Sequence, residues 1–144
     1  MKNNISAQVA ETIRVRAHQV WEALTTPSII KQYFFGTDTE TDWKVGSPIK
    51  FSGEYQGKQY QDKGNILEFE PEKKIKYSYW SSMSGIEDKP ENYVPVTYEV
   101  EENNGYTIVT ITQENIPSEE MKQHSAENWS KVLKSLKDLL ELKK

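Results

Sequence analysis

The C-terminal sequence SEEMKQHSAENWSKVLKSLKDLLELKK, residues 118–144, is the part of the chain from which the architecture can be deduced. Ser118 is a favourable helix N-cap, and two acidic residues follow it where the helix dipole is positive. The periodicity predicts one helix over residues 119–142. At about 1.5 Å per residue this helix is roughly 36 Å long, enough to lie along a whole β-sheet.

The apolar face of this helix changes along its length. Bulky side chains lie at helical spacing in its C-terminal half: Trp129, Val132, Leu133, Leu136, Leu139 and Leu140. Extended toward the N-terminus, the same face carries Lys122 and Ser125. In a close-packed interior, large side chains on the facing element fill the space beneath small residues; where these large side chains are missing, a cavity remains. We therefore expect a partly apolar cavity under the first half of the helix.

Two alternatives to this interpretation remain open at the level of sequence. A tyrosine from the sheet, Tyr77, Tyr79 or Tyr98, would fill the space and hydrogen-bond Ser125. Lys122 would lay its aliphatic stem on apolar surface and hold its charge in water. If Lys122 instead lies at a cavity mouth, it is placed to pair with an acidic ligand group.

The rest of the chain predicts a sheet with two helices inserted after its first strand. Alternation over residues 7–16 predicts a strand, and two short helices follow, the second beginning at Pro27. Residues 45–115 are typical of an antiparallel meander, with a loop at 81–92 and a hairpin at Asn103-Asn104-Gly105. We predict a single α+β domain over residues 1–144: a curved antiparallel sheet of about six strands with the long helix packed across it.

Four blocks of sequence carry a resemblance to a known family. They are VWEALTTPSIIKQYFFG (20–36), WKVGSPIKF (43–51), GNILEFEP (64–71) and HSAENWSKVL (124–133). Together they resemble bacterial homologues of the heat-shock-protein-90 ATPase activator, within the START-like, or SRPBCC, superfamily. The resemblance implies a helix-grip fold with a deep hydrophobic cavity between sheet and helix. These blocks define a fold and not a reaction, so they imply no activity by themselves.

Composition excludes several classes of function. The 144 residues carry a formal charge of −4, which disfavours nucleic acid as a partner. The sequence has no cysteine and two histidines, His18 and His124, without metal-binding spacing, so we expect no metal and no cofactor. Neither a secretory signal nor a bilayer-spanning run is visible, so we expect a cytoplasmic protein without membrane insertion.

These observations predict a module that binds a small apolar or aromatic molecule without catalysis. The candidate cavity residues are Tyr33, Phe34, Phe51, Tyr77, Tyr79, Tyr98, Ile111, Gln113, Lys122, Ser125 and Trp129. One alternative, from the resemblance, is a protein that interacts with a chaperone, for which Trp80 is the only hint of an exposed apolar strip. A second is a cyclase- or hydrolase-type enzyme, in which Asp62, Glu54 or Gln113 would point inward.

Overall fold

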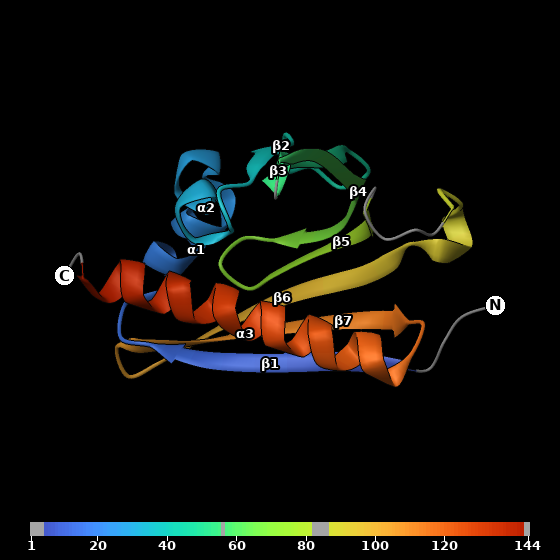
Figure 1. Cartoon of the computed structure of the whole chain (residues 1–144). Helices are drawn as coiled ribbons and strands as arrows, with labels where there is room; N and C mark the ends of the chain where they lie inside the picture. Colours follow the sequence, from blue (N-terminus) through green and yellow to red (C-terminus); the bar gives the residue numbers. More distant parts are fainter. Residues whose placement is uncertain (1–4, 56, 82–86, 143–144) are drawn as a thin grey trace.

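The computed structural model describes residues 5–55, 57–81 and 87–142. Its strands are β1 (Ile5–Ile13), β2 (Asp38–Glu40), β3 (Pro48–Tyr55), β4 (Lys58–Glu70), β5 (Lys74–Ser81), β6 (Val94–Asn103) and β7 (Tyr106–Ile116). Its helices are α1 (Ala17–Thr25), α2 (Pro27–Tyr33) and α3 (Glu119–Leu142), with a 3₁₀ turn, η1, at Pro90–Asn92. Figure 1 shows α1 and α2 near one end of the sheet and α3 along it.

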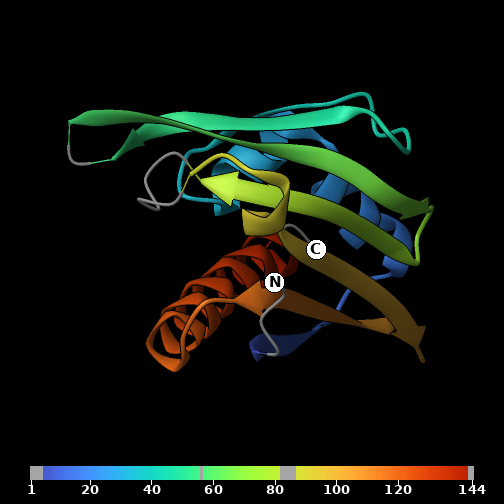
Figure 2. The ribbon, with the colours of Figure 1, turned by 90° about the vertical axis from the view of Figure 1, so that its right-hand side faces the viewer.

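The strands form one antiparallel sheet in the order β1-β7-β6-β5-β4-β3-β2. The sheet is open and curves around α3 (Figure 2). This is the α+β helix-grip fold that the sequence predicts, with seven strands in the described residues where about six were expected. The additional strand, β2, pairs three residues with β3 and is too short to show an alternating pattern.

The second short helix begins where its sequence predicts, at Pro27, whereas the first begins at Ala17 and already includes His18. β1 ends at Ile13, before the predicted Arg16, because Arg16 is already the N-cap of α1. Pro27 occupies the first turn of α2, where its missing N–H is not needed. The predicted β6–β7 hairpin is present, with Asn104 and Gly105 both at positive φ (55° and 89°).

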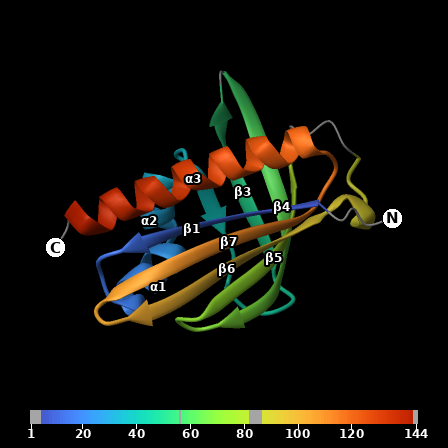
Figure 3. The same ribbon diagram turned by 90° about the horizontal axis from the view of Figure 1, so that it is seen from below.

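Helix α3 packs mainly on β1 and β7 (Figure 3). The predicted N-cap is present, since the Met121 N–H donates to the Ser118 hydroxyl at 3.2 Å. Trp129, Val132, Leu133 and Leu136 are buried, and Leu139 and Leu140 pack at the edge of the core. The apolar face deduced from the C-terminal half of the helix is therefore the face that contacts the sheet.

Strands β4 and β5 approach each other closely at Gly64. A Cβ atom added to Gly64 would collide with the carbonyl oxygen of Ser78, and the strand register shifts between Ile66 and Glu68. Glycine is therefore required at position 64 by backbone proximity and not by flexibility. Of the loop predicted at 81–92, residues 82–86 lie outside the described residues.

Candidate ligand-binding cavity

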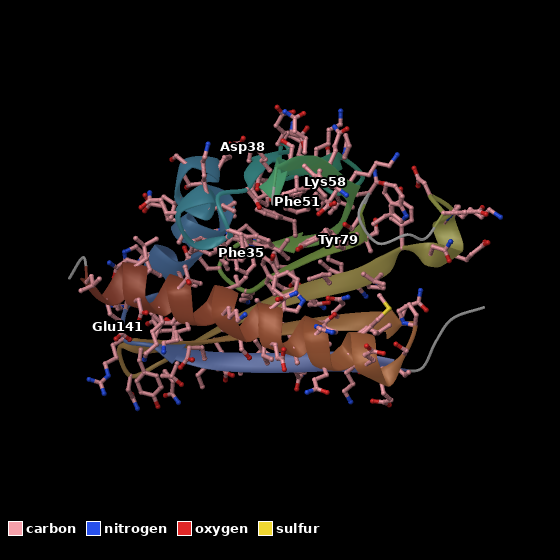
Figure 4. All side chains as sticks on the ribbon, in the orientation of Figure 1. Phe35, Asp38, Phe51, Lys58, Tyr79 and Glu141 are labelled. Carbon is pink, nitrogen blue, oxygen red and sulfur yellow. The ribbon has the colours of Figure 1, made fainter. Side chains whose placement is uncertain are left out.

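A cavity of about 490 Å³ lies between α3, the segment after α2, and strands β3, β4, β5 and β7. Its lining consists of Phe34, Phe35, Thr37, Phe51, Tyr60, Asp62, Tyr79, Ser81, Gln113, Ser125, Asn128, Trp129, Lys131 and Val132. Figure 4 shows Phe35, Phe51 and Tyr79 in the space between α3 and the strands above it. The volume falls in the range of known small-molecule sites.

Aromatic rings form the apolar part of the lining. The Phe34 ring lies nearly parallel to Phe51 at 6.2 Å and edge-on to Trp129 at 5.6 Å, both between centroids. Tyr79 meets Phe51 edge-on at 5.9 Å. Rings offset or tilted at these distances support one another and present flat apolar surface to a guest.

Hydrogen bonds hold the polar groups of the lining in place. The hydroxyls of Thr37 and Tyr60 are 2.6 Å apart, and the Trp129 indole N–H donates to Gln113 Oε1 at 2.8 Å. The Tyr79 hydroxyl donates to Asp62 Oδ2 at 2.6 Å. Burial, and after it the negative charge of Asp62, raises the pKa of Tyr79 well above its usual value.

Six of the residues predicted from the sequence line this cavity. They are Phe34, Phe51, Tyr79, Gln113, Ser125 and Trp129. They come from α3, β3, β5, β7 and the end of α2, so the fold brings together residues up to 95 positions apart in the chain, from Phe34 to Trp129.

Three predicted tyrosines lie behind the cavity, in the packed core. Tyr77 and Tyr98 place their hydroxyls 2.8 Å apart, and Tyr33 donates to the Ala23 carbonyl at 3.0 Å. The space beside them is only about 10 Å³. Burial raises the pKa of all three. Tyrosines thus fill part of the interior, but they do so deeper than Ser125 and leave the larger cavity open.

The two remaining predicted residues lie outside the cavity lining. Ile111 is buried in the core. Lys122 is exposed, as are its neighbours from Glu119 to His124. Because these first turns of α3 do not bury a side chain, the apolar face cannot be extended to them. The cavity lies under residues 125–132 of α3, so it reaches into the first half of the helix, as predicted, but not under the first turns.

Asp62 points inward, as one of the sequence alternatives required, whereas Glu54 is exposed on β3. Glu54 therefore does not belong among the inward polar groups. It lies three residues after the inward Phe51, so the alternation of the strand places it on the outer face.

Several lining residues were not predicted from the sequence. Phe35 was not among the candidate cavity residues. For Tyr60 the sequence offers one signal, the glycine at position 53. Tyr60 pairs with Gly53 in the adjacent strand, and a Cβ added to Gly53 would lie 2.6 Å from the Tyr60 hydroxyl. Asn128, Lys131 and Val132 flank Trp129 on α3 and mark the width of the cavity along the helix.

The described residues contain no cluster of three His, Cys, Asp or Glu side chains that would hold a metal ion. His18 and His124 are both exposed. None of the helices in the described ranges combines the length and the apolar character that crossing a membrane requires.

The profile of the family described as "Activator of Hsp90 ATPase homolog 1-like protein" matches residues 14–141. The chain belongs to this family. Among curated proteins, none matches the chain significantly. Among solved structures, ChR145 from Cytophaga hutchinsonii is 43% identical over 99% of this chain and 98% of its own, with a TM-score of 0.85.

More distant solved structures share the fold of this family member. The Aha1 dimer from Colwellia psychrerythraea is 23% identical over 95% of this chain and 96% of that chain (TM-score 0.74). DynU16, a putative protein in the dynemicin biosynthetic locus, is 15% identical and aligns with 99% of this chain over 49% of its own (TM-score 0.81). At these identities the likeness shows the fold alone.

Proposed function

We propose that this protein binds a small apolar or aromatic molecule in the cavity between α3 and the sheet, without catalysing a reaction. The observation that supports the proposal is the cavity of about 490 Å³ lined by aromatic rings. A concave, mostly apolar space of this size with a few polar groups is typical of small-molecule sites.

The polar groups of the lining support a site that orients its ligand. Thr37, Tyr60, Gln113 and Asp62 surround the apolar rings, and hydrogen bonds hold each of them. A few fixed polar groups in an otherwise apolar pocket are typical of specific small-molecule sites. A cytoplasmic site of action stays a prediction of the sequence.

A cavity-filling variant tests the proposal. We expect Ser125→Phe to place a ring in the cavity and to reduce binding of a neutral environment-sensitive dye at least about tenfold. Ser135→Phe is the matched control, because Ser135 is exposed on the same helix and does not line the cavity. Dye binding follows from fluorescence, and NMR signals of Trp129 and Val132 locate the bound molecule.

The proposal fails if the signals of Trp129 and Val132 stay unchanged with apolar and aromatic compounds at millimolar concentration. It also fails if Ser125→Phe and Ser135→Phe weaken binding equally, because the bound dye would then lie elsewhere.

Interaction with a chaperone is the second candidate, and the family match over residues 14–141 favours it. The exposed large apolar side chains of the described residues, Phe35, Val45, Leu67, Met121 and Leu142, come from separate segments. Trp80 is partly buried, with the Lys63 ammonium 5.8 Å from the centre of its ring. Co-purification with the host chaperone and a change in its ATP turnover would support this candidate, and the absence of both would remove it.

A further inference from the structure

One wall of the cavity is a row of side chains that crosses three strands. Asp62 on β4 is paired with Phe51 on β3 and with Ser81 on β5, and all three line the cavity (Phe51 is labelled in Figure 4). Asp62 is 6% exposed. A carboxylate so deeply placed in a site of aromatic rings is costly and persists only with hydrogen-bond support. Tyr79 provides that support at 2.6 Å.

Toward a ligand, the Asp62–Tyr79 pair presents hydrogen-bond acceptors and not donors. An ionised carboxylate only accepts hydrogen bonds, and the Tyr79 hydroxyl already donates its proton to Asp62. A ligand group lying here gains energy if it donates a hydrogen bond and loses energy if it is an anion.

The positive charge of Lys131 does not cancel the effect of Asp62 on the charge of a bound ligand. Of the described residues that line the cavity, Asp62 and Lys131 are the charged ones. Lys131 is exposed on α3, so water and salt screen its charge, whereas Asp62 is buried and screened much less. The inner wall therefore sets the charge preference of the cavity.

We infer that the cavity selects aromatic or apolar molecules that carry a hydrogen-bond donor, a hydroxyl or an ammonium group, and rejects carboxylates, with Asp62 as the residue that determines this specificity. The inference rests on the proposed function and narrows it. It excludes fatty-acid anions as preferred ligands.

Four naphthalenes of nearly equal size test the inference on the full-length protein at pH 7. They are 2-naphthol, 2-(aminomethyl)naphthalene, 2-methoxynaphthalene and 2-naphthoate. We expect the naphthol or the amine to bind about tenfold more tightly than the naphthoate, a difference of about 1.4 kcal/mol, with the methoxy compound weaker than the naphthol. Comparing the first two compounds separates hydroxyl from ammonium ligands. NMR shifts of Trp129 and Val132 report occupancy.

Asp62→Asn tests the residue itself. The amide keeps the shape and the oxygen that accepts from Tyr79, and it removes the charge. We expect the preference over naphthoate to fall to threefold or less, on the order of 0.7 kcal/mol. Glu54→Gln is the matched control, since it also converts an acid to its amide, on the exposed side of β3. It is expected to keep the wild-type preference.

The outcomes separate the two proposals. Naphthoate binding as tightly as the naphthol and the amine overturns the donor preference and leaves the proposed function standing. An unchanged preference in Asp62→Asn overturns the role of Asp62. If none of the four compounds shifts Trp129 or Val132, the proposed function fails and the inference with it. Should Asp62→Asn fail to fold, the four-compound series on the wild type decides.

Discussion

Phe35 has a backbone conformation that its side chain does not favour. Its φ is 53°, in the left-handed region, and 61% of its surface is exposed, yet the ring lines the cavity and packs edge-on against Phe34. Of the other four non-glycine residues with positive φ in the described part of the chain, two are asparagines, Asn104 and Asn115, which tolerate this region. A strained aromatic at the edge of a cavity is consistent with a role in ligand contact.

Replacing Phe35 is therefore expected to move stability and binding in opposite directions. Phe35→Asn should raise the free energy of unfolding by roughly 0.5 kcal/mol, because asparagine adopts the left-handed conformation more readily. The same change should weaken ligand binding, because the ring leaves the lining. Thermal unfolding and the dye titration measure the two effects. Phe35→Leu keeps the strain and should show no gain in stability; a gain equal to that of Phe35→Asn would contradict the explanation.

At the scale of elements, Glu102 joins the end of β6 to the start of α1. Its carboxylate accepts from the Ala17 backbone N–H at 2.7 Å and from Arg16 Nε at 3.2 Å. A carboxylate at a helix N-terminus satisfies a free N–H and interacts favourably with the helix dipole. These contacts, with the Ala17 N–H as the largest cause, lower the pKa of Glu102 from its ordinary 4.5.

The stabilisation by Glu102 should depend on pH. A lowered pKa in the folded state means that the contribution is fully present above about pH 4.5 and is lost as the pH falls through the folded value. We expect Glu102→Gln to lower the melting temperature by a few degrees at pH 7 and by less as the pH falls below 4.5. Glu101→Gln, at the preceding exposed residue, is the control and should change little. A difference between Glu102→Gln and wild type that grows toward low pH would refute the explanation.

At the scale of the whole molecule, one core joins α3, α1, α2 and the sheet. Leu136 is fully buried in it, whereas Leu142, on the same helix, is 85% exposed. We expect Leu136→Ala to cost about 2–5 kcal/mol of unfolding free energy and Leu142→Ala less than about 0.5 kcal/mol. Circular dichroism and tryptophan fluorescence should report one coincident transition in each variant. Two separated transitions would contradict the prediction of a single domain.

The architecture was predictable because local sequence patterns indicate its helices, strands and turns. The spacing of Trp129, Val132, Leu133 and Leu136 identifies the face of α3 that packs on the sheet, and Asn104-Gly105 identifies the hairpin between β6 and β7. Periodicity, caps and turn residues act over a few positions, so one sequence is sufficient to recognise them. The short strand β2 was not predicted, because three residues are too few to show an alternating pattern.

The cavity depends on contacts between residues distant in sequence, and local patterns do not encode these. Lys122 satisfies the helical spacing, but the side chains of residues 119–124 are all exposed, so the face that packs on the sheet does not extend to them. Asp62 faces the cavity because its pairing with Phe51 and Ser81 is set by the register of three strands, and a shift of one residue would turn it to the outer face. Local periodicity thus accounts for the elements and their order, while strand register and the curvature of the sheet determine which side chains meet around the cavity.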